Sequence, residues 1–276
     1  MNSLQRCLTG LLLVAPLNVW AQGQVVMLAS QAIQNPLATP AAPVTSESVT
    51  SESVTPEAKA ADNSATQAAF NKVLIPFNGK QRADMDYQQA LRALSTGAVT
   101  QAQARLSDAL KHQPLHVAAR QLLATIDDHK QQANEAMQLL QDGVKLLPQQ
   151  AVFNLMLARL YGEQGQAARG IALLEKLEAP DALRNKVDAM LAALYQRVAR
   201  YDDAIVVYRS LLQRNPRQAM WWLGLALSLE ASRRPANALS AYQQARNAGP
   251  GRRALERFIA ERINALSNAN VSSQPS

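Results

Sequence analysis

The pattern of apolar and polar residues repeats along the chain with a long period, and prolines mark this period. Pro114, Pro148, Pro216 and Pro250 fall on one even period with a single missing beat, and Pro180 stands two residues short of that beat. Proline ends a helix, so each beat is predicted to close one structural unit. The pattern therefore predicts five successive units, each of about 34 residues.

The second half of each unit pairs a small residue with a large residue four positions later. The clearest pairs are Ala102 and Leu106, Ala136 and Leu140, Ala204 and Tyr208, and Ala238 and Tyr242. A spacing of four places both side chains on one face of a helix. In the third unit Gly170 replaces the alanine and the unit closes early, at Pro180.

The first half of each unit carries a second helical motif. It is written Leu157-Ala158-x-x-Tyr161 in one unit and Leu191-Ala192-x-x-Tyr195 in the next, with Leu225-Ala226-x-x-Leu229 in the last. Two helices per unit give ten helices. The small residues are expected to let neighbouring helices approach closely, with the large residues wedged between units.

An eleventh helix is predicted over residues 252–267, after the last unit. Its apolar residues fall on one stripe, formed by Leu255, Phe258, Ile259, Ile263 and Leu266. The end of a stack of repeats exposes an apolar face, so this helix is expected to cap it. Residues 268–276 are polar and are predicted to form a disordered tail.

The set of Trp or Leu, Gly or Ala, and Tyr in the first helix, followed by Ala, a large residue, Ala and a closing Pro, resembles the tetratricopeptide repeat. This resemblance implies an all-α fold: an α-solenoid of about five helix-turn-helix repeats, followed by a C-terminal capping helix and preceded by a disordered linker. The repeat domain with its cap is expected to span residues 83–267.

Residues 1–21 resemble a targeting segment, with Arg6 before an apolar run that ends at Ala21. A cleaved signal peptide and a retained membrane anchor both remain open. The run from Cys7 to Ala21 is shorter than the roughly 20 residues of a spanning helix, and it contains Pro16. Either alternative exports the rest of the chain, to the periplasm or to the periplasmic side of the inner membrane.

Residues 22–82 are predicted to be a disordered linker of low complexity. The segment Thr45–Val49 recurs directly as Thr50–Val54, and the range holds four basic and four acidic residues. It buries too little apolar surface to offset its chain entropy. An apolar patch over residues 70–77 is the one part of this range expected to dock on a partner or on the domain itself.

Composition argues against catalysis. The single cysteine among 276 residues, Cys7, excludes a disulfide scaffold and a cysteine-based zinc site. His112 and His116 are separated by Pro114, and the cluster at Asp127–His129 lacks a further ligand. No phosphate-binding loop or nucleophile elbow is present. The sequence therefore predicts a non-enzyme with no metal and no cofactor.

Charge is distributed unevenly around a net charge of +7. Residues 83–183 carry a net charge of −2, and residues 184–262 carry +8. A solvated face is the default explanation of this basic half, and an acidic protein or an anionic lipid surface is the alternative. Nucleic acid is not expected, because the chain is exported and aromatic residues are not interleaved with the basic ones.

The tetratricopeptide resemblance also implies a peptide-binding groove, lined by defined positions of the first helices. A protein partner, presenting an extended or helical segment, is the expected ligand. Trp222 matches a packing position and is expected in the core, whereas Trp221 points elsewhere and is a candidate anchor. The candidate protein-binding residues are Gln121, Thr125, Leu155, Arg159, Lys186, Ala189, Arg197, Trp221 and Leu223.

A closer resemblance rests on the stretch from Tyr195 to Glu230, which includes Tyr201-Asp202-Asp203-Ala204 and Trp221–Glu230. It is similar to the MshN family, which belongs to the biogenesis machinery of the mannose-sensitive haemagglutinin (MSHA) pilus, a type IV pilus. The resemblance implies a scaffold for pilus or secretion assembly. A general envelope adaptor that organises cell-wall enzymes or peptidoglycan is the alternative function.

Overall fold

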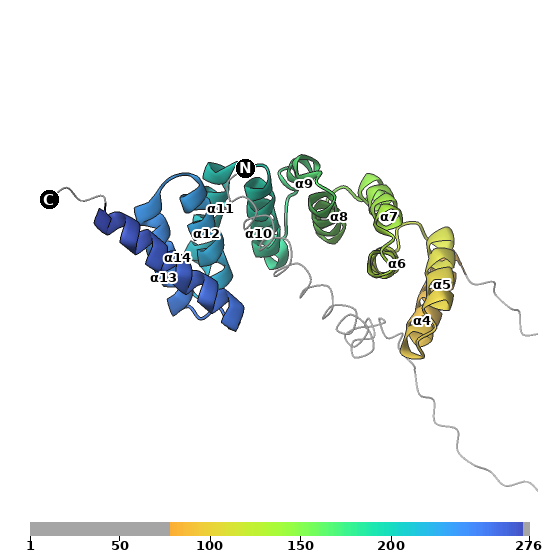
Figure 1. The fold of residues 1–276 in the computed structure, drawn as a ribbon. Coiled ribbons are helices and arrows are strands. Elements are labelled where there is room, and N and C mark those ends of the chain that lie inside the picture. The colour runs from red at the N-terminus through yellow and green to blue at the C-terminus, as the bar shows by residue number, and fades with distance from the viewer. Residues whose placement is uncertain (1–77, 273–276) are drawn as a thin grey trace, which may run out of the picture. The chain divides into compact units, whose positions relative to one another are not determined.

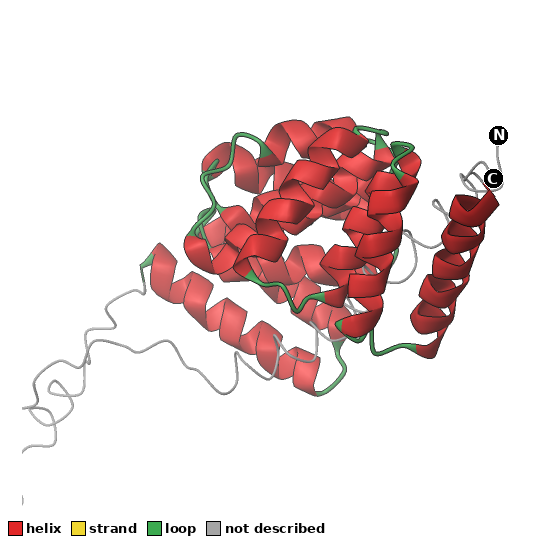
Figure 2. Cartoon of the chain, turned by 90° about the vertical axis from the view of Figure 1, so that its left-hand side faces the viewer, coloured by secondary structure: helices red, strands yellow, loops and turns green. Residues whose placement is uncertain are grey.

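The computed structural model describes residues 78–272, which form eleven α-helices and no strand (Figures 1 and 2). The predicted targeting segment, most of the predicted linker and the apolar patch lie outside these residues. The helices are α4 (Gly79–Ser95), α5 (Val99–His112), α6 (Val117–His129), α7 (Ala133–Leu146), α8 (Ala151–Glu163), α9 (Ala167–Leu174), α10 (Asp181–Arg197), α11 (Tyr201–Arg214), α12 (Ala219–Ala231), α13 (Pro235–Asn247) and α14 (Arg253–Ser272).

The described helices divide into two compact units. Helices α4 and α5 belong to the first, which ends at Gln113, and α6–α14 belong to the second, which begins at Pro114. In the second unit each helix packs against the next in chain order, as a stack of helix pairs does. The all-α tetratricopeptide-type fold that the resemblance implies is confirmed.

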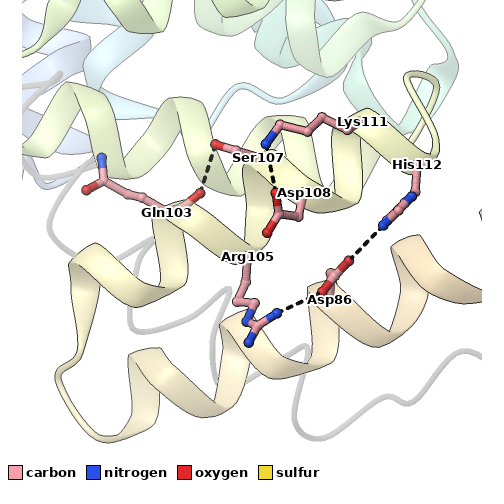
Figure 3. Close-up of polar contacts among 7 residues, drawn as sticks. All are labelled: Asp86, Gln103, Arg105, Ser107, Asp108, Lys111 and His112. Atoms are coloured by element: carbon pink, nitrogen blue, oxygen red, sulfur yellow. Dashed lines mark hydrogen bonds and ion pairs between the residues drawn. The ribbon is translucent and has the colours of Figure 1, made fainter.

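Helix α4 begins at Gly79, four residues inside the range predicted as linker. Asn78 explains this early start, because it forms a capping box with Gln81: each side chain accepts a hydrogen bond from the other's backbone N–H, at 2.9 and 3.0 Å. Within the α4–α5 pair, Asp86 pairs with Arg105 at 3.5 Å and with His112 at 3.7 Å (Figure 3).

The turn between the two helices of a repeat has the same geometry in all five repeats. The residue at its apex has a positive φ in every copy, and the next N–H donates to a carbonyl five residues earlier in the chain. This is the Schellman arrangement that ends helices. The apex residues, with φ between 59° and 77°, are Gly97, Gln131, Gly165, Ala199 and Arg233.

Small residues lie at the helix crossings, as the sequence motifs predict. Every alanine at the first-helix position has no exposed surface: Ala90, Ala124, Ala158, Ala192 and Ala226. Gly170 occupies the matching second-helix position of the third repeat. A Cβ on Gly170 would lie 2.9 Å from Leu194 Cδ1 and 3.0 Å from the carbonyl oxygen of Ala158, so glycine permits the close approach there.

The third repeat departs from the period, as its early proline predicts. Helix α9 has 8 residues, whereas α7 and α11 have 14 each. Helix α10 begins immediately after Pro180, about one turn earlier than the period requires. The chain therefore shortens one helix and lengthens the next, and Ala192 and Ala204 return to their buried positions.

Helix α14 covers the end of the stack. The predicted stripe is buried at Leu255, Ile259, Ile263 and Leu266, and Phe258 packs against the same apolar core from its edge. The helix continues to Ser272, into the range predicted as tail. No proline or glycine interrupts the sequence between Arg253 and Gln274, so nothing stops the helix earlier.

Candidate protein-binding site

The nine candidate residues lie on the first helices of four repeats. Helix α6 carries Gln121 and Thr125, α8 carries Leu155 and Arg159, α10 carries Lys186, Ala189 and Arg197, and α12 carries Trp221 and Leu223. Each is described below by the surface that it offers and the contacts that it makes.

Arg159 is the centre of a charged cluster that joins two repeats. Its guanidinium donates to Asp128 of α6 at 2.6 Å and to Glu163 of its own helix at 2.8 and 2.9 Å. Burial acts to lower the pKa of Arg159, but the two carboxylates outweigh burial and raise this pKa above its ordinary value. Two carboxylates against one guanidinium leave a local charge of about −1, so Arg159 adds no positive charge to this surface.

Lys186 and Arg197 are the other two positively charged candidate residues. Lys186 is exposed near the start of α10, and Arg197 is half-buried at the end of the same helix. A Cβ on Gly162 of α8 would lie 4.0 Å from Arg197 Cδ and Nε, so the Arg197 side chain runs along the preceding first helix. Lys186 is the more accessible of the two.

The remaining residues of α6, α8 and α10 offer a neutral surface. The Thr125 hydroxyl donates to the carbonyl oxygen of Gln121 at 2.8 Å within α6, and both side chains are partly exposed. Leu155 and Ala189 are half-buried and pack against the main apolar core. These positions supply contact area around the charged cluster.

The surface at the fifth repeat differs from the one predicted. Leu223 is only 4% exposed and packs in the core, so it offers almost no surface to a partner. Trp221 is half-buried and packs against the same core. The neighbouring groove position Met220 is 37% exposed. Met220 and the edge of Trp221 therefore form the apolar end of this face.

Trp222 is half-buried, not a fully buried core residue as the sequence pattern suggests. Its indole N–H donates to the carbonyl oxygen of Pro216 at 2.7 Å. Asn154 donates to Pro148, and Arg120 to Pro114, both at 2.9 Å and from the same repeat position. A tryptophan, an asparagine and an arginine thus tie α12, α8 and α6 to the proline that precedes each of them.

The fourth repeat lacks both the proline and the side chain that donates to its carbonyl oxygen. It has Ala182 where the second, third and fifth repeats have a proline, and Asp188 at the anchoring position. Asp188 forms an ion pair with Arg214 of α11 instead. Sequence reasoning missed the anchor because its residue type varies; the constant six-residue separation from proline is the signal that reveals it.

Some basic side chains of residues 184–262 are paired with acidic side chains of the same range, and the net charge of +8 rests on the other basic residues. Arg200 pairs with Asp203 at 2.6 Å, Arg234 pairs with Asp202 at 2.8 Å, and Arg262 pairs with Glu230. The Tyr195 hydroxyl donates to Glu175 at 2.7 Å. Burial and this carboxylate raise the pKa of Tyr195 to about 12.

The histidines and the acidic cluster have structural contacts. His116 caps α6, with Nδ1 accepting a hydrogen bond from the Ala119 N–H at 3.1 Å, and His112 ends α5 beside Asp86. Within residues 78–272 no three His, Cys, Asp or Glu side chains are grouped to hold a metal ion. None of the helices described there is long and apolar enough to cross a membrane.

Residues 87–151 and 189–253 match the family model described as tetratricopeptide repeat. These stretches are tetratricopeptide repeats. No curated protein matches the chain. The repeat is a protein-interaction module, so the prediction of a scaffold that binds proteins is supported at that level.

Three solved structures illustrate the fold. YrrB, described as a TPR protein with an unusual peptide-binding site, is 14% identical, with a TM-score of 0.57 over 72% of this chain and 98% of its own. PilF of Pseudomonas aeruginosa is 19% identical, with a TM-score of 0.56 over 71% and 88%. MamA is 17% identical, with a TM-score of 0.55 over 60% and 91%. At these identities the likeness shows the fold alone.

Proposed function

We propose that the chain is a non-enzymatic scaffold that binds a segment of another protein along its first helices. The observation that carries this proposal is the succession of surfaces on these helices. The acidic cluster around Arg159 is followed by Lys186 on α10 and by the apolar Met220 and Trp221 on α12. A matching partner segment presents a basic residue, then an acidic one, then an apolar side chain.

We further propose that this scaffold works in the assembly of a type IV pilus of the MSHA kind, on the periplasmic side of the inner membrane. The resemblance of Tyr195–Glu230 to the MshN family supports the pilus assignment, and the fold is shared with the pilus-related PilF. The resemblance of residues 1–21 to a targeting segment supports export. Whether this segment is cleaved or retained leaves the proposed site unchanged.

Two substitutions test the proposed surface. Lys186→Glu and Met220→Asp change exposed side chains, and each should weaken partner binding by about tenfold or more, because one reverses a charge and the other places a carboxylate on the apolar end. Arg253→Glu on α14 is the control with the same charge change as Lys186→Glu. Affinity capture from detergent-solubilised envelope, read by mass spectrometry, measures the pilus components retained.

Arg159 should not be used in this test. Reversing its charge would place three carboxylates together in a half-buried cluster and destabilise the fold, which would mimic a loss of binding. If the Lys186 and Met220 variants retain the same pilus components as the native chain, the first-helix surface is not the binding site.

The alternative function, an adaptor for the cell wall, predicts a different capture. Under that alternative, purified peptidoglycan sacculi retain the native chain, and the envelope capture recovers cell-wall enzymes instead of pilus components. The pilus proposal predicts no retention on sacculi.

A further inference from the structure

A second surface lies on the side of α12 opposite Met220. Met220, Leu223 and Leu227 lie on the side of this helix that belongs to the first-helix site. Trp222, Leu225 and Leu229 lie on the other side, as a rotation of about 100° per residue requires. The second set forms the floor of a groove between α11 and α13, with a volume of about 570 Å³. The groove is shallow and open to solvent.

The rims of this groove carry polar side chains without partners. Asn237 and Gln244 of α13 and Gln213 of α11 line the groove and are exposed. Their side-chain amides make no hydrogen bond with the rest of the described chain. Asn237 and Gln244 are seven residues apart on one helix, about 10 Å, which is the length of three residues of an extended chain.

The rim also carries a positive charge that no carboxylate of residues 78–272 balances. Arg209 of α11 lines the groove and is exposed. Three other arginines of the second unit, Arg200, Arg214 and Arg234, each pair with an aspartate. An anionic group on an occupant would supply the missing partner.

We propose that this groove binds an extended segment of a second partner protein, one with an acidic residue beside apolar side chains. The apolar side chains contact the exposed part of Trp222, with the nearly buried Leu225 and Leu229 beneath it, the segment's backbone amides bond with the rim amides, and its carboxylate pairs with Arg209. Because the two surfaces lie on opposite sides of α12, the scaffold holds two partners at once. This proposal goes beyond the first-helix site and does not depend on it.

The experiment is a selection of random ten-residue peptides displayed on phage, with the full chain as target. Enriched peptides are synthesised with a fluorescent label, and their affinity is measured by anisotropy. The target variants are Arg209→Glu, which reverses the rim charge, and Ser240→Trp, which fills the groove from an exposed rim position. Arg253→Glu is the charge-matched control, and circular dichroism verifies that every variant is folded.

We expect enriched peptides with an aspartate or glutamate next to apolar residues. Their affinity should fall by about tenfold or more in the Arg209→Glu and Ser240→Trp variants and remain unchanged in Arg253→Glu and Lys186→Glu. The absence of enriched peptides, or binding that is insensitive to both groove variants, would overturn the proposal.

Two other occupants are distinguished by the same proteins. If a synthetic peptide of residues 45–54, with its repeated Glu and Val, binds with the same dependence on Arg209, the groove belongs to the chain's own N-terminal region. If light scattering shows a dimer that Ser240→Trp dissociates, the groove is an interface between two copies. Either result would overturn the assignment to a second partner.

Discussion

Single side chains fix how neighbouring repeats meet. Gln196 is buried and donates to the Gly224 carbonyl oxygen at 2.8 Å and to the Ser228 hydroxyl at 2.7 Å, while the Tyr208 hydroxyl donates to Gln196 at 3.2 Å. This network joins α10, α11 and α12. Because each buried polar group has a partner, the network favours one arrangement of the two repeats over others.

Gly224 should be intolerant of even a methyl group. A Cβ at this position would lie 2.3 Å from Tyr208 Cζ, so Gly224→Ala should lower the free energy of unfolding by about 1–3 kcal/mol, measured by urea denaturation. Combining it with Tyr208→Leu, which removes the clashing ring, should cost less than the sum of the single substitutions. Strict additivity would show that the tyrosine ring does not limit the space at Gly224.

Alkaline pH should destabilise the domain through its buried tyrosines. The pKa of Tyr195 is about 12 in the folded chain, against about 10 in an unfolded one, so folding favours the protonated phenol. This contribution to stability is full below about pH 10 and is lost as pH rises through about 12. Urea midpoints measured across this interval should fall, and fall less in Tyr195→Phe.

Burial also raises the pKa values of Tyr208 and Tyr242, so Tyr195→Phe should reduce the alkaline loss without removing it. An identical pH dependence in the native chain and in Tyr195→Phe would contradict the assignment of a raised pKa to Tyr195.

At the scale of the helices, the turn between the two helices of a repeat is the most regular element. Its apex requires a left-handed backbone, which glycine adopts without strain and other residues adopt at a cost. Glycine stands at Gly97 and Gly165, whereas Gln131, Ala199 and Arg233 occupy the same position in other repeats. The chain therefore stores strain in three of its five turns.

Exchanging alanine and glycine at two such turns should give opposite effects. Ala199→Gly should raise the free energy of unfolding by about 0.5–1 kcal/mol, and Gly165→Ala should lower it by about the same amount. A Cβ on Gly165 would meet no atom within 4 Å, so only the backbone conformation is tested. Thermal denaturation measures both, and effects of the same sign would refute the argument.

The regular elements of the fold were predictable, and the irregular ones less so. The repeat period, the buried alanines and the stripe of α14 follow from side-chain size and helical spacing alone. The start of α4 at Gly79 depends on a local capping box. The role of Trp222 depends on a hydrogen bond to Pro216, and the neutralisation of Arg159 on the distant carboxylate of Asp128. Such contacts are set by tertiary packing, which a repeat pattern does not specify.

At the scale of the whole second unit, stability depends on neighbouring helices and on the cap. Ending the chain at Pro250 removes α14 and uncovers the apolar core that Leu255, Ile259 and Ile263 cover. The truncated chain should aggregate, as light scattering would show. A chain ending at Ser272, which keeps α14, is the control. A soluble truncation with unchanged thermal stability would show that α14 is not a cap.

The central claim is that the first-helix surface holds a partner protein in the envelope. The most direct test places a photo-crosslinking amino acid at Lys186 or Gln121 and, as a control, at Arg253 on α14, in the native host. The account predicts crosslinks to a pilus-assembly component from the two first-helix positions and none from position 253. Crosslinks from position 253 alone, or none to a pilus component from any position, would contradict it.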